Sequence, residues 1–197
     1  MKISFIKESY NSFDSFLKWQ LFTGFIASLT WSLSVPIIHK LQGFYWTTAY
    51  ISIYLIFIRM SGLIMPFFKG AKLKNLYFTI IVLNTLYALS LFVYFYDVHI
   101  FLWVEVGLSI IYSVAAPLLG IGWDVYVVKE YPEDVFENFR YWEAIKDSLG
   151  GIIGSAIVAI MASLTSLDQT VMTFISAMFM MLVIQHVNWN KFYKKMQ

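Results

Sequence analysis

Six long stretches of apolar residues alternate along this chain with short segments that carry charged side chains. The charge-free intervals are about 18 to 22 residues long, and an α-helix needs roughly 20 apolar residues to cross the hydrocarbon core of a bilayer. Backbone polar groups in lipid must be satisfied inside helices. The pattern therefore predicts an all-α integral membrane protein, one domain over residues 1–197, with transmembrane helices at about 16–38, 44–66, 75–96, 100–126, 143–163 and 169–190.

The segment between the fourth and fifth predicted spans has a different pattern. Pro132 suits the first turn of a helix, and Glu133 suits the positive end of the helix dipole. Val135 and Phe139 belong to an apolar series at helical spacing. The sequence predicts a short amphipathic helix over about 132–142 that lies along the cytoplasmic surface of the membrane.

Basic residues are distributed asymmetrically about the six spans. If the spans are taken in order, every lysine and arginine except Lys40 falls on the side that also holds both termini. Basic residues in short loops are retained in the cytoplasm. We therefore expect both termini to be cytoplasmic, in a membrane of the bacterial inner-membrane type.

Composition excludes several classes of protein. The chain is 59% hydrophobic and only 13% charged, which is far from the composition of a soluble domain. Its net charge of +2 is too small to indicate nucleic-acid binding. Cysteine is absent, and the sequence contains neither a metal-spaced histidine pair nor a phosphate-binding loop nor a serine elbow. We expect no metal, no cofactor and no enzymatic activity.

Ionisable residues at membrane depth are the best candidates for function, because burying them is expensive. Glu105 either faces a central cavity or reaches the outer interface. Arg59 either contacts a solute or extends to the cytoplasmic interface. The predicted solute or ion pathway comprises Glu105, Arg59, Trp31 and Asn84. Further polar or aromatic groups that could line a pocket, but that more often make ordinary contacts between helices or at the interface, are Tyr87, Tyr112, Gln185 and His186.

The order of these features resembles the amino-terminal half of a major facilitator superfamily transporter. The resemblance rests on six spans, a basic loop after the second span, and the stretch APLLGIGWDVYVVKEYPEDVFENFRYWEAIKDSLGGIIGSA at Ala116–Ala156. Full members of that superfamily have two six-helix halves with the substrate between them. The resemblance implies a major-facilitator-like half bundle in this chain.

The loop after the second span departs from the superfamily pattern. Residues 66–74 contain lysines but no acidic residue. A charge network of reversed polarity, with Lys72 or Lys74 paired to Asp124 or Glu130, is our hypothesis for this place. The candidate residues for this gate or charge network are Lys72, Lys74, Asp124, Glu130 and Arg140.

A half transporter would need a second half. Two copies inserted in the same orientation have the relation that the two halves of a full transporter show. Small residues at the start of the fifth span allow close approach of another helix, either from a second copy or within the same bundle. These residues are Gly150, Gly151, Gly154 and Ser155.

The sequence thus predicts a half-size secondary transporter that moves a small solute by alternating access. Its expected partners are membrane lipid, a small-molecule solute and a second half, either a homodimer partner or a related chain, with no nucleic acid. The alternative is a non-transporting assembly or accessory protein that docks onto another membrane complex. An interior lined by Glu105, Asn84 and Trp31 favours transport, and one filled with Leu, Ile and Phe favours docking.

Overall fold

The computed structural model describes residues 10–32 and 72–196, together with scattered positions between 48 and 63. All regular secondary structure within these ranges is helical. The elements are α2 (Ser15–Trp31), α4 (Leu73–Ser90), the 3-10 helix η2 (Leu91–Phe95), α5 (Val98–Glu130), α6 (Glu133–Leu164) and α7 (Leu167–Phe192). The second predicted span, 44–66, and the end of the first lie largely outside the described residues.

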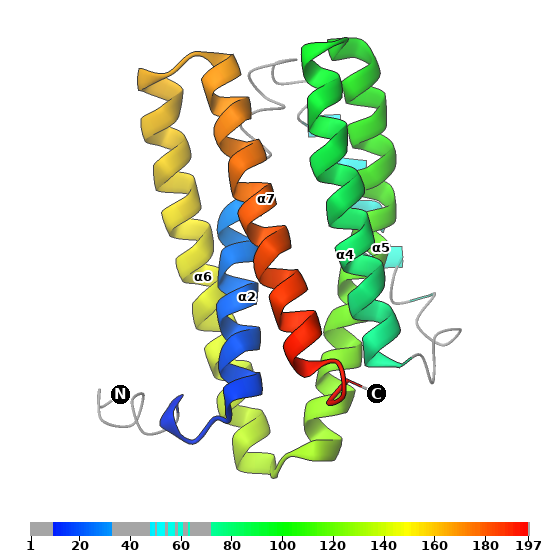
Figure 1. Ribbon diagram of the computed structural model, residues 1–197, viewed down its shortest axis with the longest axis vertical. Coiled ribbons are helices and arrows are strands. Elements are labelled where there is room, and N and C mark those ends of the chain that lie inside the picture. Colours follow the sequence, from blue (N-terminus) through cyan, green and yellow to red (C-terminus); the bar gives the residue numbers. More distant parts are fainter. Residues whose placement is uncertain are drawn as a thin grey trace.

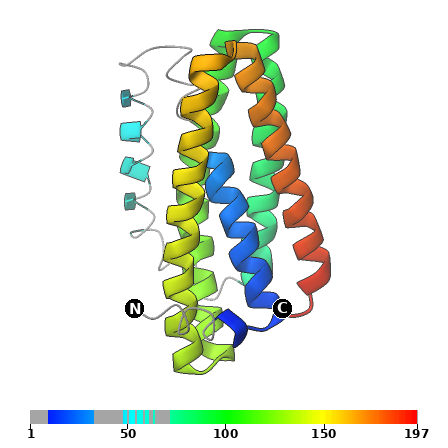
Figure 2. The same cartoon turned by 90° about the vertical axis from the view of Figure 1, so that its left-hand side faces the viewer.

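The helices form an upright bundle in which α4 and α7 run antiparallel to α5 and α4, respectively, whereas α2 and α6 run parallel to each other (Figure 1). The pair α4–α5 and the pair α6–α7 are hairpins, and the shorter α2 packs against both α6 and α7. Helix α7 also contacts α4, so it joins the two hairpins. The view turned by 90° shows α2 between α6 and α7 (Figure 2).

Four helices are long and apolar enough to cross a membrane: Leu73–Phe95, Val98–Glu130, Glu133–Met161 and Asp168–Phe192. They overlap the third to sixth predicted spans, although the helix at the fifth begins about ten residues earlier than predicted. The expectation of an all-α fold with helices suited to a membrane is confirmed for these described segments.

The segment around residues 132–142 differs from its predicted structure. It is not a separate surface helix, because α6 continues without interruption from Glu133 to Leu164. Its apolar side chains, among them Val135 and Phe139, pack against the start of the chain, where Phe13 and Phe16 are buried. No helix-breaking residue separates the amphipathic turns from the apolar ones, so the helix extends through both.

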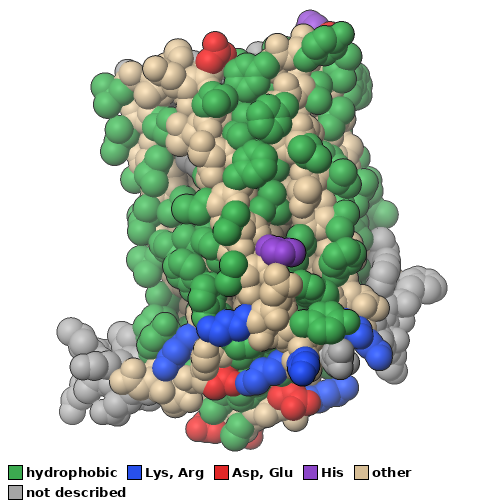
Figure 3. All heavy atoms as spheres, in the orientation of Figure 1, with side chains coloured by type: hydrophobic (Ala, Val, Ile, Leu, Met, Phe, Trp, Pro, Cys, Tyr) green, Lys and Arg blue, Asp and Glu red, His purple; other side chains and the backbone are tan. Residues whose placement is uncertain are grey.

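Charged residues gather at one end of the bundle, which we call the basic end. There α2 and α6 begin and α5 and α7 end (Figure 1). Lysine and arginine side chains form a band across this end, while hydrophobic side chains cover most of the surface beyond it (Figure 3). Large apolar side chains such as Leu164 and Trp103 are at least 70% exposed. Such a surface suits contact with lipid chains and a charged rim at the membrane interface.

Polar caps fix where several helices begin. The Asp14 carboxylate accepts from the Leu17 N–H at the start of α2, and Asp97 does the same for His99 at the start of α5. Ser166 starts α7 with a reciprocal capping box. These caps satisfy N–H groups that a helix cannot pair internally.

Candidate functional site

Polar side chains are buried inside the bundle at several levels. Glu105 is the only ionisable residue among them, and it is 2% exposed. It lies about 10 Å from the start of α5, given a rise of about 1.5 Å per residue. The buried polar residues are Gln20, Thr23, Thr30, Asn84, Ser90, Glu105, Ser109, Ser113, Thr170, Gln185 and Asn188.

Glu105 has no basic partner among the described residues, none of whose ion pairs includes it. The side chain of Tyr87 on α4 interacts with the carboxyl group. The second carboxyl oxygen, Oε2, has no hydrogen-bonding partner within the described part of the chain. Glu105 therefore points into the bundle rather than to the outer interface.

Three aromatic rings meet beside this carboxyl group. The Trp31 ring at the end of α2 lies 4.7 Å from the Tyr87 ring and 4.6 Å from the Tyr112 ring, measured between centroids. Tyr112 follows Glu105 by seven residues on α5, so both project from the same face of that helix. Ser109, four residues after Glu105, shares that face and is buried. The rings thus connect α2, α4 and α5 around the carboxyl group.

A second polar contact lies one turn along α4. The Asn84 side-chain amide donates to Gln185 Oε1 on α7 at 2.9 Å. Because Nδ2 is the donating atom, Oδ1 is left as an acceptor, and it has no partner among the described residues. One helical turn further along α7, the Asn188 amide donates to the Tyr77 hydroxyl at 2.8 Å. Two buried polar contacts thus link α4 to α7 between the level of Glu105 and the basic end.

The structure brings most of the predicted pathway together. The Trp31 ring contacts Tyr87, Tyr87 interacts with Glu105, and Asn84 stands one helical turn before Tyr87 on α4. Arg59 is exposed, and no contact of the described residues joins it to this group. His186 is exposed too, so it faces away from the interior.

Sequence reasoning did not find Ser109 and Asn188. The signal was available, because each stands one helical turn from a residue that was singled out. Ser109 follows Glu105 by four positions, and Asn188 follows Gln185 by three. Extending each polar candidate by one turn would have found both.

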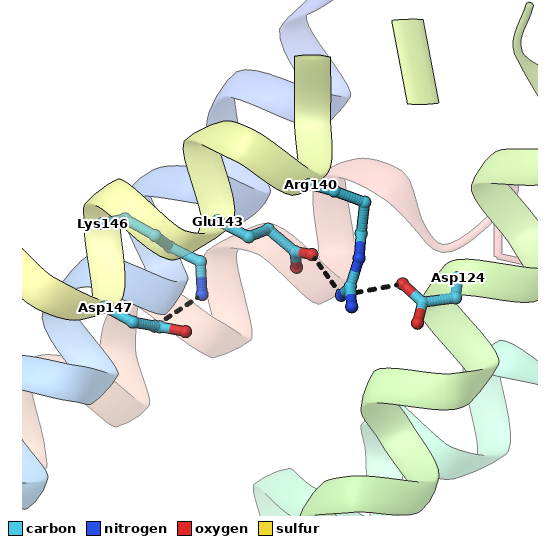
Figure 4. Close-up of polar contacts among 5 residues, drawn as sticks. All are labelled: Asp124, Arg140, Glu143, Lys146 and Asp147. Carbon is cyan, nitrogen blue, oxygen red and sulfur yellow. Dashed lines mark hydrogen bonds and ion pairs between the residues drawn. The ribbon is translucent and has the colours of Figure 1, made fainter. Parts of the chain in front are cut away.

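A charge network at the basic end connects α5 to α6 (Figure 4). One guanidinium nitrogen of Arg140 lies 3.2 Å from Asp124 Oδ1 and 3.0 Å from Glu143 Oε2. Lys146 pairs with the neighbouring Asp147 at 3.0 Å.

This network corrects the predicted pairing. Asp124 pairs with Arg140 from α6, and no ion pair among the described residues includes Lys72, Lys74 or Glu130. Lys74 lies over the Tyr193 ring instead, 5.5 Å from its centroid. The reason is topological, because the turn between α5 and α6 folds Arg140 back beside the end of α5.

Asp14 joins three distant segments at the basic end. Its carboxylate caps α2, accepts from the Tyr131 hydroxyl at 3.0 Å, and pairs with Lys195 at 2.6 Å. Burial raises the pKa of Asp14, but the hydrogen bonds from Lys195, Leu17 and Tyr131, with the lysine charge, outweigh it and hold the pKa below its ordinary value. The contact ties the start of the first helix to the end of the last.

The small residues of α6 divide between two faces. A Cβ atom at Gly150 would lie 2.8 Å from Ser28 Cβ, and one at Gly154 would lie 2.7 Å from the backbone oxygen of Leu29, both on α2. Gly151 has no atom within 4 Å of the corresponding position, and Ser155 is exposed. Gly150 and Gly154 are therefore used in packing within the bundle.

No protein-family model, curated protein or solved structure matches this chain. The resemblance to the major facilitator superfamily remains a hypothesis. The functional argument therefore rests on the buried carboxyl group and its surroundings.

Proposed function

We propose that this chain is a half-size secondary transporter subunit that moves a small solute across the membrane by alternating access. The observation that carries the proposal is the buried Glu105 carboxyl group, which has no basic partner among the described residues. A charged side chain at the centre of a membrane helix costs about 3 kcal/mol on insertion scales. A cost of this size, with no structural ion pair to offset it, is typical of a residue that serves transport.

The position of Glu105 supports the same function. Its surroundings come from α4 and, through the aromatic rings, from α2 and α5, so relative movement of these helices would change access to it. Most of the remaining interior is apolar, with buried Phe101, Phe174 and Met178. A purely structural bundle would need no carboxyl group among these side chains.

The charge network at the basic end is weak enough to open and close as a gate. Arg140 and Asp124 are 53% and 34% exposed in their side chains, and ion pairs this accessible to solvent contribute at most about 1 kcal/mol. Such a contact between α5 and α6 can break and reform during each cycle. We assign Asp124, Arg140 and Glu143 to this gate.

The proposal includes six spans, termini on the cytoplasmic side of an inner membrane, and assembly with a second half. Gly151 and Ser155, on the face of α6 turned away from α2, are the small residues that remain available to a second copy. A parallel dimer through this face would place two equivalent sites about a common axis.

Thiol accessibility tests alternating access without knowledge of the solute. The natural chain contains no cysteine, so Ser109→Cys introduces a single thiol on the face of α5 that carries Glu105. In proteoliposomes, a small charged membrane-impermeant thiol reagent is expected to modify this cysteine from the inside and from the outside.

The matched control is Val171→Cys, which places a thiol at a fully buried apolar position of α7. It should stay unreactive, because no water path reaches it. If Ser109→Cys reacts no faster than Val171→Cys from either side, the bundle is static. That result would refute transport and favour the accessory protein that docks onto another complex.

A further inference from the structure

Two buried side chains of this region, Glu105 and Asn84, each carry an oxygen atom that can accept a further hydrogen bond. Glu105 Oε2 and Asn84 Oδ1 both lack a partner among the described residues, and their residues are 2% and 0% exposed. The Asn84 amide nitrogen is already engaged by Gln185, so the side chain cannot turn its donor inward without breaking that bond. A ligand that reaches these two oxygen atoms would donate hydrogen bonds to them.

The unpaired carboxyl group of Glu105 also favours a positively charged ligand. Glu105 has no ion pair with any described residue, and on the face shown in Figure 3 the lysine and arginine side chains lie at the basic end. A buried carboxylate is stable only when a proton or another cation neutralises it. The protein provides no permanent counterion of its own in the described interior.

The aromatic rings favour an organic cation over an inorganic one. The Trp31 ring contacts both the Tyr87 ring and the Tyr112 ring, with centroid distances of 4.7 and 4.6 Å. Ring faces attract ammonium groups, and tryptophan does so best. A metal cation of similar charge would prefer a shell of oxygen ligands, of which this group offers few.

We propose that the solute recognised at this site is a small organic cation, a protonated amine or a quaternary ammonium compound. Glu105 neutralises its charge, the rings of Trp31, Tyr87 and Tyr112 contact its alkyl groups, and Asn84 Oδ1 accepts a hydrogen bond where the ligand has one to donate. This inference rests on the proposed function, because it takes the Glu105 site as the solute site.

The test uses a matched pair of ligands that differ only in charge. Choline and 3,3-dimethylbutan-1-ol have the same shape, but the second carries carbon where the first carries nitrogen. Binding of each to the full-length protein in a mild detergent is measured by isothermal titration calorimetry at low ionic strength. Choline is expected to bind, and the neutral alcohol is expected to bind about tenfold more weakly or not at all.

Two variants identify the site. Glu105→Gln keeps the size of the side chain and removes its charge, so choline affinity should fall about tenfold or more. Asp134→Asn removes an exposed carboxylate from the first turn of α6 and should leave choline affinity unchanged. Glu105→Gln also removes a buried charge, so loss of folding is not expected to confuse the result.

The outcomes separate this inference from the proposed function. Equal binding of both ligands, binding of neither, unchanged affinity in Glu105→Gln, or displacement of choline by equimolar sodium would each overturn the organic-cation assignment. If Ser109→Cys is reactive from both sides while choline does not bind, the transport proposal stands and this inference fails. If choline binds but Ser109→Cys is unreactive, the cation site stands and the transport proposal fails.

Discussion

The contact of Gly154 with α2 permits a sharp test of the bundle. A Cβ atom added at this position would lie 2.6 Å from Ser32 Cβ and 2.7 Å from the Leu29 backbone oxygen. Ordinary van der Waals contact begins at 3.4 Å, so in Gly154→Ala the helices must separate locally by roughly 0.7 Å. The carbonyl oxygen belongs to the helix backbone and cannot move away alone.

The expected effect is a loss of stability. Overpacking of this kind costs about 1 to 3 kcal/mol, whereas replacing glycine by alanine inside a helix gains about 1 kcal/mol from helix propensity. Gly151→Ala, three residues earlier on the same helix, has the gain without the clash, because no atom lies within 4 Å of its Cβ position. The difference between the two variants therefore measures the clash itself.

Thermal unfolding in detergent provides the measurement. Gly151→Ala should unfold at or above the temperature of the natural protein, and Gly154→Ala should unfold below it. If Gly154→Ala is as stable as Gly151→Ala, α2 and α6 do not pack as the structure places them. The same comparison bears on assembly, because Gly154 would then be available to a second copy.

Three further predictions concern the ends of the bundle. The pKa of Asp14 is lower in the folded than in the unfolded chain, so the stabilisation contributed by its carboxylate is complete above pH about 4 and is lost as pH falls through the folded pKa. Asp14→Asn should therefore lose less stability between pH 5 and 3 than the natural protein, by a difference below about 1 kcal/mol. An identical pH profile would contradict the contact with Lys195. Ser166→Ala, which removes the capping box of α7, should destabilise the protein by about 1 kcal/mol in the same unfolding assay, and no change would mean that this end is frayed. Tyr96→Cys, at a position that is 89% exposed, should react with an impermeant maleimide in intact cells, whereas Lys194→Cys should react only after permeabilisation; the reverse pattern would invert the proposed orientation.

Local properties of the sequence were enough to predict the helices. Length and hydropathy act within a single segment, so the third, fourth and sixth spans and the end of the fifth could be placed to within a few residues. They could not show that residues 132–142 continue into the fifth span as α6, because the amphipathic turns pack against Phe13 and Phe16. These aromatic residues are more than one hundred positions away.

The same distinction between local sequence properties and tertiary packing applies to the candidate site. Glu105, Asn84 and Trp31 were recognisable because polar or amphipathic residues are conspicuous in apolar spans. Their meeting around Tyr87 depends on how α2, α4 and α5 pack. Arg59 was recognisable for the same reason, yet the structure does not bring it to this group.

Pairing choices were settled by the tertiary structure alone. The sequence offered Asp124 several basic partners, and the fold selects Arg140 because the turn after α5 brings α6 alongside. It offered Gly150 and Gly154 either a second copy or a neighbouring helix, and the fold places both against α2. Burial in a membrane is decided residue by residue, whereas a contact between two helices depends on the path of the whole chain between them.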